Sequence, residues 1–589
     1  MYFFLDFVSP YYFNIGMAHI HKKMKKGRPY YYIRETARVD GKPKVVNQVY
    51  LGSIERILEL ATGKEQKIAT IQAQEFGALW LANLIDGQID VAGIIDGVVP
   101  KSEQETGPSV GEYFLYAVLN RMVDARSKRA LPEWYGASAI QQIRPVDTKS
   151  LTSQRFWKKW NRVDAGHLEQ IAARFFQQVA AMEPGVSDCF MFDTTNYYTF
   201  MASDTESDLA QRGKNKEGRD WLRQVGVALL VARDTRLPVF YREYEGNRHD
   251  SKLFLRVMQE LFAAMDAVGD GSGELTLVFD KGMNAEDNFA LIDENPRLHF
   301  ITTYSTYYAE ELIHIDRQKF QAVDTVNNRR LREQNRSDDQ LTAWRTVGDY
   351  WGKERTVVVT YNPLTATRQR YAFEKKLLRL QEELSLMRSN VLARHRGWRN
   401  KTQIEERYKD LCLQLHLPAD LYTVELYDDD GRLRMNCRKN HYRINRHIDR
   451  FGKNILITDN MGWSTDDIVR ASLDRYAVEH SFRQSKDDDL VSLMPLRHWT
   501  DDKIRCHIFS CIVALTYLRV IELRLRRAGL EMSAGEAMDE MHRLHSCLIW
   551  QQKSKKPERM IEKPGDKQAA ILKAFGYKVV DGVLQKISR

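Results

Sequence analysis

The alternation of hydrophobic and polar positions near the start of the chain predicts a β-hairpin. Residues 30–52 read YYYIRETARVDGKPKVVNQVYLG and alternate on both sides of Asp40-Gly41. A period of two is typical of a half-buried strand, and Asp-Gly is a preferred hairpin turn. From about residue 70 to 182 the apolar positions recur at helical spacing instead. We therefore expect a small strand pair followed by a helical region.

The pattern changes again near residue 189 and predicts a mixed α/β sheet. The expected strands cover residues 189–200, 223–233, 236–244, 274–280 and 299–305. The turn between the second and third strands is short, which makes them antiparallel neighbours. Helices are expected from about Ser251 and from Asn284. Three strands followed by alternating strands and helices favour one mixed sheet.

This alternation stops after residue 305, so we interpret residues 306–450 as an insertion into the α/β domain. The segment contains a long charged helix, a second helix near IEERYKDLCLQL and a hairpin that turns at Asp430-Gly431. The strand 453–459 and a helix near 465–487 restore the earlier pattern. Residues 500–530 predict a mostly buried helix, and the basic tail past Lys553 is expected to be loosely ordered.

These patterns divide the chain into six parts. Residues 1–27 are interpreted as a non-native extension, because the first clearly patterned element begins at Tyr30. They do not resemble a signal peptide, since the apolar start precedes the basic cluster. The other parts are a hairpin and helical region (28–182), the first part of the α/β core (183–305), the insertion (306–450), the second part of the core (451–530) and a basic tail (531–589).

Composition adds modest constraints. The chain has 589 residues and a formal net charge of +9, which favours a polyanionic partner. A solvated basic surface explains the same excess equally well. The six cysteines are scattered, which indicates a reducing cytoplasm and neither disulfides nor a zinc site. The apolar stretch 508–518 is too short to span a bilayer, so no membrane segment is expected.

Two aspartates follow apolar strand residues within the same α/β unit. Asp193 follows CFMF, and Asp280 follows LTLVF. Carboxylates at strand ends lie at the sheet edge where open α/β sheets bind ligands. Two neighbouring carboxylates attract a divalent cation, and hard oxygen ligands suit magnesium or manganese. A single aspartate in such a place more often caps a turn or helix.

A third carboxylate lies on a helix whose other polar residues are mostly cationic. Relative to Glu479, Arg475 is at i−4, Arg483 at i+4 and Lys486 at i+7, and Ser472 is at i−7. At 3.6 residues per turn these groups share one face. One interpretation is a solvated face with helical ion pairs. The other is a metal-binding carboxylate flanked by phosphate-binding cations.

The sequence resembles the DDE transposases of bacterial insertion sequences. FDTTNYY resembles the strand of the first Asp, VFDKGMN that of the second, and RYAVEHSFRQSKDDDL the Glu helix of the branch with Tyr, Arg, Glu and Lys at fixed spacing. EGNRHD and LMPLRHW also resemble family segments. The resemblance runs from about Arg28 to Leu525. It departs at Ser472, where the family has Tyr, and Tyr476 is the nearest substitute.

The resemblance implies a ribonuclease H-like fold, a DNA-binding role for the hairpin and helical region 28–182, and a set of functional residues. Asp193, Asp280 and Glu479 would be catalytic and hold two Mg²⁺ or Mn²⁺ ions. Arg475, Arg483 and Lys486 would contact DNA phosphates, and the insertion would grip the transposon end through Arg438, Lys439 and Arg443. A solvated basic loop is an equally good interpretation of that insertion surface.

The implied activity is metal-dependent cleavage at the ends of an insertion sequence, followed by strand transfer. Its partners would be double-stranded DNA, as terminal inverted repeats and as target, and a second subunit in a homodimer. A cytoplasmic, nucleoid-associated location is expected. The alternatives are a catalytically silent repressor or domesticated relative, and a ribonuclease H-like nuclease that only hydrolyses DNA.

Several other residues fit structural roles better. Asp459 and Asp250 are expected in loop or cap positions, and His480 to point away from Glu479. Trp344, Trp351 and Trp398 could stack on a displaced base, but core packing is the preferred interpretation.

Overall fold

A computed structural model describes most of the chain as two compact units. The described residues are 17–25, 28–39, 42–61, 68–185, 187–202, 204–213, 218–268, 273–487, 489–552, 554 and 556–587. One unit contains Met1–Ala73 and Cys547–Met560, and the other contains Gln74–Ser546 and Ile561–Arg589. We call them the small unit and the large unit and describe each by itself.

The small unit contains an antiparallel sheet that confirms the hairpin predicted for residues 30–52. Its elements are β1 (Met17–Lys25), β2 (Arg28–Val39), β3 (Lys42–Gly52) and α1 (Ile54–Ala61). Ile33 of β2 pairs with Val49 of β3, and the turn at Asp40-Gly41 lies outside the described residues. The segment expected to be an extension includes β1, which pairs with β2 along its whole length.

A second sheet has the strand order β18-β17-β4. Its strands, most of whose residues belong to the small unit, are β4 (Ile68–Glu75), β17 (His545–Gln551) and β18 (Glu558–Ile561).

The large unit begins with the helices expected between residues 70 and 182. They are α2 (Gly77–Ile89), α3 (Val91–Asp96), α4 (Val110–Val123), α5 (Leu131–Ala137), α6 (Ile140–Ile143), η1 (Thr148–Leu151), α7 (Ser153–Trp160) and α8 (Ala165–Met182). Side-chain hydrogen bonds at the N-terminus determine where such a helix begins. In α4, the Ser109 side chain accepts from the Glu112 N–H while Glu112 reaches back to the Ser109 N–H.

The centre of the large unit is a 10-stranded mixed sheet, consistent with a ribonuclease H-like fold. Its order is β11-β12-β13-β16-β10-β9-β5-β7-β6, with β8 paired to β7. β5, β9 and β10 are parallel neighbours, and the pairs β5–β7 and β7–β8 are antiparallel. The strands are β5 (Cys189–Thr199), β6 (Gln211–Arg212), β7 (Arg223–Ala232), β8 (Pro238–Glu245), β9 (Leu275–Phe279), β10 (Leu298–Tyr304), β11 (Gln321–Ala322), β12 (Thr342–Tyr350), β13 (Lys353–Tyr361) and β16 (Lys453–Thr458).

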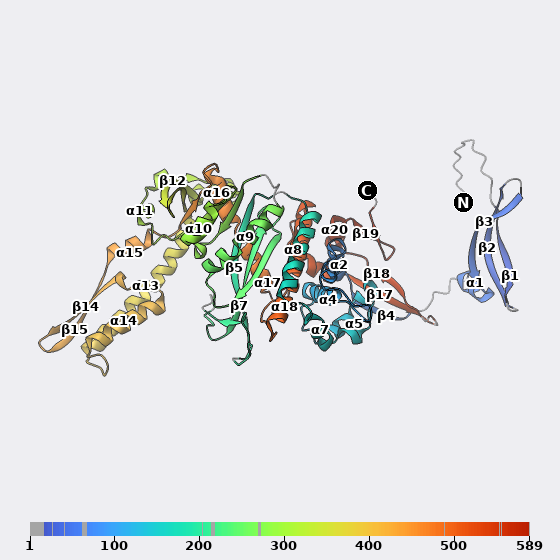
Figure 1. The fold of residues 1–589 in the computed structure, drawn as a ribbon, viewed down its shortest axis with the longest axis horizontal. Coiled ribbons are helices and arrows are strands. Elements are labelled where there is room, and N and C mark those ends of the chain that lie inside the picture. Colours follow the sequence, from blue (N-terminus) through green and yellow to red (C-terminus); the bar gives the residue numbers. More distant parts are fainter. Residues whose placement is uncertain are drawn as a thin grey trace, which may run out of the picture. The chain divides into compact units, whose positions relative to one another are not determined.

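Helices cover both faces of this sheet (Figure 1). Because side chains alternate along a strand, Met191 of β5 joins the core under α4, α8 and α18 (Asp501–Arg527), and Phe190 and Phe192 join the core under α9 (Asp250–Val268) and α10 (Glu286–Asp293). The helices of residues 77–182 thus share one core with the sheet. The boundary predicted at residue 182 does not separate two cores.

α18 is the central helix of the first core. By length and composition it could cross a membrane, with a mean hydropathy of 1.6 over its most apolar window, but 94% of that window is buried inside the protein. Its polar groups are paired internally: the Tyr517 hydroxyl donates to Asp86 over 2.8 Å, and Arg144 pairs with the other oxygen of Asp86 at 2.9 Å. α18 is therefore a core helix.

The segment 306–450 is only partly a separate insertion. β11, β12 and β13 extend the main sheet, and β13 pairs with β16. The insertion subdomain proper runs from Pro363 to Ile448 and has its own core, which includes Leu380, Ile404 and Met435. Its elements are α13 (Pro363–Leu392), α14 (Lys401–Leu415), η5 (Ala419–Leu421), β14 (Tyr422–Asp429), β15 (Arg432–Lys439) and α15 (His441–Ile448).

The expectation of a loosely ordered tail past Lys553 is wrong for the residues that the structure describes. Besides β18, the C-terminal region forms α20 (Asp566–Ala574), β19 (Tyr577–Val580) and β20 (Val583–Lys586), after α19 (Ala534–His542). Ile571 and Leu572 of α20 are fully buried in the main core. The basic charge of this segment hid a sparse apolar pattern that is sufficient for packing.

The remaining elements connect these parts. They are η2 (Lys281–Met283), α11 (Glu310–Ile313), η3 (Arg317–Lys319), α12 (Val326–Glu333), η4 (Ser337–Asp339), α16 (Thr465–Asp474) and α17 (Tyr476–Ser485).

Candidate active site

Asp193 and Asp280 lie side by side on adjacent parallel strands. The ladder between β5 and β9 pairs Cys189 with Thr276 and ends at Met191 and Val278. Continued by two residues, the same register places Asp193 opposite Asp280. β5 continues past Asp193 to Thr199 along β7, which agrees with the strand expected over residues 189–200 and places Asp193 within the strand and not at its end. The two carboxylates therefore lie where β9 leaves β5.

The surroundings of Asp280 favour its ionised form. Thr303 Oγ1, from the end of β10, donates to Asp280 Oδ1 over 2.6 Å. Burial by itself raises the pKa of Asp280, but the Thr303 hydrogen bond and the Arg475 charge outweigh it, so that this pKa lies below its usual value. Thr303 could not be recognised from sequence, because its place depends on how β10 pairs with β9.

Glu479 reaches the same place from a helix. The predicted helix 465–487 is interrupted at Arg475, which ends α16 and begins α17. Arg475 Nη2 lies 3.0 Å from Glu479 Oε1, and its Nη1 lies 3.9 Å from Asp280 Oδ2. The guanidinium thus bridges carboxylates from two different elements.

These residues line one open cavity of about 700 Å³. The expected residues that the structure brings together here are Asp193, Asp280, Glu479, Arg475, Arg483 and Lys486. The lining residues not singled out from the sequence are Thr194, Thr195, Phe482 and Asp487. Sequence signals existed for three of these residues. Thr194 and Thr195 belong to the DTT run within β5, and Asp487 belongs to the acidic run after Lys486.

Two buried polar connections hold α17 over β5. Tyr197, on β5, has its hydroxyl 2.6 Å from the Ser485 hydroxyl. Arg519 of α18 donates to His480 Nδ1 over 3.1 Å and to Gln484. His480 is therefore turned away from the cavity, as expected. The position of Glu479 depends on contacts with β5 and α18, neither of which is local in sequence.

Two neighbours on this helix are not where the sequence suggested. Ser472 and Tyr476 do not line the cavity, and the Tyr476 ring lies against the Arg236 guanidinium at 5.3 Å. Both expectations assumed one regular helix through Arg475.

The insertion cations are not brought to this cavity. Arg438 and Lys439 are exposed at the end of β15, and Arg443 lies 3.3 Å from Asp420 within the same subdomain. Neighbouring Arg446 pairs with Glu310 at the base of the subdomain. The DNA-contacting role expected of Arg438, Lys439 and Arg443 remains a prediction.

The residues assigned structural roles from sequence have such contacts. Asp459 accepts from the Phe300 N–H over 2.8 Å and lies 3.3 Å from His299 Nδ1. Trp351 stacks on Phe289 with ring centroids 3.7 Å apart. Trp344 packs on the same core and Trp398 on that of the insertion subdomain. The Asp250 side chain lies outside what the structure describes.

The donor set of the cavity fits a hard divalent cation. Carboxylates from three elements open onto it, and oxygen ligands suit Mg²⁺ or Mn²⁺. Arg475 already bridges two of them, which shows that this position attracts positive charge. In the described ranges, no group of three His, Cys, Asp or Glu side chains lies close enough together to hold an ion. The carboxylates are therefore suitable ligands for such an ion, and in this structure Arg475 lies between two of them, Asp280 and Glu479.

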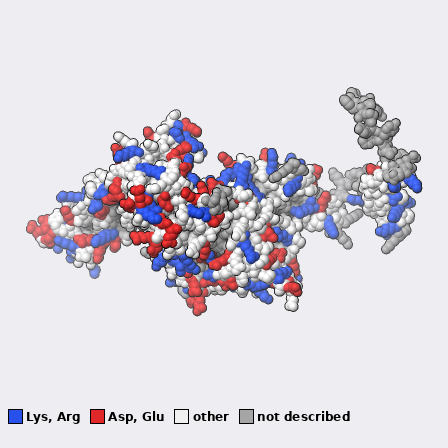
Figure 2. All heavy atoms as spheres, turned by 45° about the horizontal axis from the view of Figure 1, so that its top comes forward, with Lys and Arg blue, Asp and Glu red and all other residues white. Residues whose placement is uncertain are grey.

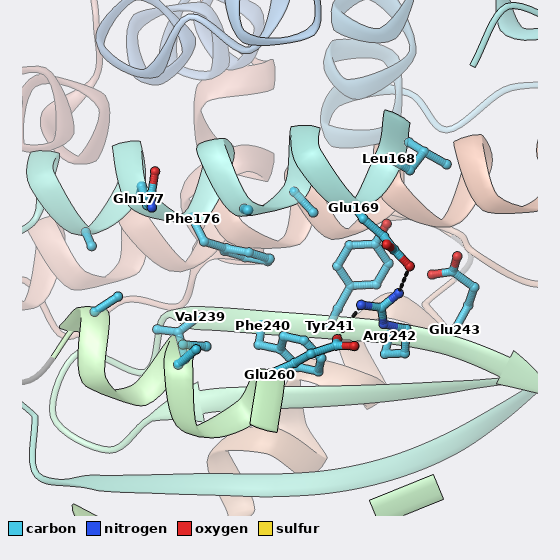
Figure 3. A pocket seen from close by; sticks show the side chains of 16 residues that line it. Leu168, Glu169, Phe176, Gln177, Val239, Phe240, Tyr241, Arg242, Glu243 and Glu260 are labelled. Atoms are coloured by element: carbon cyan, nitrogen blue, oxygen red, sulfur yellow. Dashed lines mark hydrogen bonds and ion pairs between the residues drawn. The ribbon is translucent and has the colours of Figure 1, made fainter. Parts of the chain in front are cut away.

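A different cavity, of about 450 Å³, lies between α8, β8 and α9 (Figure 3). Its walls are largely apolar and include several alanines of the two helices. Figure 3 shows Arg242 of β8 reaching toward Glu169 of α8 and Glu260 of α9, and it forms ion pairs with both. The fourth charged group of the lining, Glu243, lies 3.3 Å from Arg505 of α18. All four charged groups thus have ion-pair partners within the protein, so we assign this cavity no role in DNA chemistry.

Comparison with known proteins gives one family match. Residues 199–517, more than half of the chain, match the family model for the transposase DDE domain. The matched range contains Asp280 and Glu479 and begins after Asp193. No curated protein matches the chain. The cryo-EM structure of a piggyBac transposase synaptic complex with hairpin DNA is similar over 80% of this chain and 82% of that chain, with 10% sequence identity and a TM-score of 0.36.

Proposed function

Since the chain belongs to the transposase DDE domain family, we propose that it cleaves DNA at the ends of a mobile element and joins those ends to target DNA. One observation carries the proposal: Asp193, Asp280 and Glu479 open onto a single cavity together with Arg475, Arg483 and Lys486. Carboxylates suit the divalent ions of phosphoryl transfer, and the cations suit the DNA backbone.

Each group has a distinct task in this proposal. Asp193, Asp280 and Glu479 would hold the Mg²⁺ or Mn²⁺ ions, and the family resemblance implies two of them. Bound there, the ions supply charge stabilisation and an activated nucleophile for in-line displacement at phosphorus. Arg475, Arg483 and Lys486 hold the phosphates beside the scissile bond, so that attacking and leaving oxygens stay aligned. Thr303 keeps the Asp280 carboxylate oriented and ionised.

The finer assignment is to a bacterial insertion sequence of the branch with Arg, Glu and Lys on the catalytic helix. The spacing of Arg475, Glu479 and Lys486 supports it, and Ser472 in place of Tyr removes one phosphate contact of that branch. Arg438, Lys439 and Arg443 of the insertion subdomain would contact the terminal inverted repeat. The active form would be a homodimer that pairs two element ends.

The family match begins at residue 199, so replacement of Asp193 by Asn tests a residue that the match does not cover. On DNA carrying the sequences that flank the reading frame, Asp193→Asn should lower Mg²⁺-dependent cleavage at least about 10³-fold and leave binding of the same DNA unchanged. Asp410→Asn, an exposed position on α14, is the matched control and should cleave normally. Cleavage by Asp193→Asn at the wild-type rate would refute the assignment.

A second assay separates strand transfer from the rival functions. Pre-cleaved ends with free 3′-hydroxyls are incubated with supercoiled target DNA, Mg²⁺ and the protein. Joined products are expected. A nuclease that only hydrolyses would cut without joining, and a silent repressor would bind the ends without doing either.

A further inference from the structure

A second polar cavity lies beside the loop that follows the catalytic helix. It has a volume of about 410 Å³. Its walls are the end of α4 with residues 125–129, the α7 residues Ser153 and Trp157, and part of the loop between α17 and α18. None of these residues was singled out by itself from the sequence, although those before residue 182 lie in the region expected to bind DNA.

The charged side chains that line this cavity are cationic. They are Arg121, Arg126, Lys128, Arg129 and Arg497. No Asp or Glu lines it within the part of the chain that the structure describes. Asp124, outside the lining, pairs with Arg126 at 2.6 Å. Arg129 and Arg497 are exposed at the rim and can turn toward a ligand.

Among these cations, Lys128 gives the clearest indication of an anion-binding site. It is only 4% exposed, and its Nζ has no hydrogen-bond partner in the structure. Its ammonium lies over the rings of Phe156 and Trp160, at 5.7 and 5.2 Å from their centroids. A buried ammonium without an acceptor is costly, and the aromatic faces compensate only part of that cost.

Arg121 adds a second buried cation to the same wall. It is 8% exposed and donates to the carbonyls of Ser492 and Arg126, while its Nε has no partner. Burial and the charge of Arg121 both lower the pKa of Lys128 well below its usual range. Two like charges beside one cavity are stabilised by an anion between them.

The histidines of the cavity do not supply the missing negative charge, and they add no positive charge. Burial, with Lys128 and Arg121 nearby, lowers the pKa of His498 to about 3, and burial also lowers that of His507. Both are therefore neutral at physiological pH. At such pH the cavity attracts anions through its arginines, and an anion bound beside Lys128 would favour the charged form of that side chain.

The backbone connects this cavity to the candidate active site. The loop leaves α17 next to Lys486, the Leu493 N–H donates to the Ser485 carbonyl over 2.9 Å, and the Val491 N–H donates to the Arg121 carbonyl over 2.9 Å. The same loop carries Arg497 to the cavity rim. The cations of this cavity and those of the catalytic helix are therefore joined by one loop.

We propose that this cavity binds a backbone phosphate of the DNA substrate, with Lys128 as its buried anchor and Arg129 and Arg497 at its rim. The inference rests on the proposed function, because it takes DNA as the source of the phosphate. It adds a contact outside the catalytic helix and assigns the segment 126–129 to DNA binding.

The test uses the full chain with Lys128→Met and Arg497→Gln as separate variants. Binding to a mixed-sequence duplex is measured by fluorescence anisotropy at several salt concentrations. Each variant should bind about three- to tenfold more weakly, with a slope of log K against log [salt] smaller by about one. Arg256→Gln, 63% exposed on α9, is the matched control and should bind like the wild type.

Thermal unfolding in the presence of inorganic phosphate completes the test. Phosphate should stabilise the wild type more than Lys128→Met. Unchanged DNA affinity and salt slope in both variants would overturn the proposal, and loss of phosphate stabilisation alone would assign the cavity to free phosphate instead. Neither result depends on cleavage, so failure here differs from cleavage by Asp193→Asn, which would refute the proposed function.

Discussion

At the scale of single residues, Arg475 occupies the position between the carboxylates of the candidate active site. Its guanidinium lies 3.0 Å from Glu479 and 3.9 Å from Asp280. A cation in that position neutralises the repulsion of the carboxylates and competes with a divalent ion for them. In the proposed function, ion binding would therefore require Arg475 to move from the carboxylates, and a DNA phosphate would be its new partner.

Replacement of Arg475 by Gln should strengthen ion binding to the DNA-free protein. We expect the Mn²⁺ affinity of Arg475→Gln to rise about fivefold, because one nearby positive charge is lost in a partly solvated site. Isothermal titration calorimetry measures it without any DNA. Arg483→Gln, in the same cavity and without an ion pair to the carboxylates, should change it less. Equal affinities for Arg475→Gln and wild type would contradict this competition.

Glu75 shows how burial of one carboxyl makes stability depend on pH. Its side chain is 14% exposed, Oε1 accepts from the Leu79 N–H over 3.3 Å, and Oε2 has no partner. Burial raises the pKa of Glu75 from 4.5 to about 7. The folded state therefore holds this proton more tightly than the unfolded state does, and its stabilising effect is lost as the pH rises from about 4.5 to about 7.

The Glu75→Gln variant should lose this pH dependence. Between pH 5 and pH 8 the wild type should lose up to about 3 kcal/mol in free energy of unfolding that the variant retains. The measurement is the melting temperature of both proteins across this range. The difference between them should grow toward pH 8, and a constant difference would show that Glu75 ionises normally.

At the scale of elements, α18 joins the parts of the large unit. It packs against α4, α8 and β8, and its Arg519 fixes α17. The Phe509 ring is fully buried and lies 6.0 Å from Phe114 of α4, 6.0 Å from Phe175 of α8 and 6.2 Å from Tyr241 of β8. One side chain thus connects two helices and the sheet.

Truncation of Phe509 to Ala should destabilise the large unit strongly. The lost burial and the cavity left behind correspond to about 3–5 kcal/mol. The melting temperature should fall by several degrees in differential scanning fluorimetry. Leu378→Ala, 58% exposed on α13, should leave it within about a degree. A small effect of Phe509→Ala would mean that α18 does not depend on this cluster.

At the scale of the whole molecule, the net charge is a small excess of basic over acidic residues, 88 Lys and Arg against 79 Asp and Glu. Lys and Arg are interspersed with Asp and Glu on the face seen in Figure 2. The net charge of +9 is therefore a weak guide to DNA contacts. Local sets of cations around a cavity are more informative, as at Arg483 and Lys486 and at Lys128 and Arg497.

We expect the main sheet to fold without the insertion subdomain. Tyr361 of β13 pairs with Lys453 of β16, and the Asn362 N–H donates to the Gly452 carbonyl over 2.8 Å, so the subdomain leaves and returns at one point. Replacement of residues 362–452 by an Asn-Gly turn should leave a folded sheet, because two residues of this type close an antiparallel pair.

Circular dichroism and thermal unfolding of that deletion protein test the expectation. It should unfold cooperatively, and its affinity for element-end DNA should fall if Arg438, Lys439 and Arg443 contact it. An aggregated or unfolded product would show that the ion pairs of Glu310 with Arg446 and Arg450 are essential to the large unit.

Much of the fold was predictable because its signals are local. Alternating strands, the hairpins and the long charged helix follow from periodicity. Polar residues at the ends of apolar runs and on a helix face made Asp193, Asp280 and Glu479 candidates, and the family resemblance selected them from the alternatives. The tail past Lys553 was misjudged, because its few apolar residues are buried only by packing on distant helices. The break at Arg475 has no sequence signal that we can identify.

The sequence by itself determined which residue types were available for chemistry and where the main strands and helices lie, since periodicity and residue spacing act within a few residues. Only the tertiary structure decided that Asp280 lies beside Asp193 and Thr303, that Arg475 bridges two carboxylates and that Lys128 is buried among aromatic rings. Those relations depend on strand register and on packing between segments hundreds of residues apart, which no local pattern encodes.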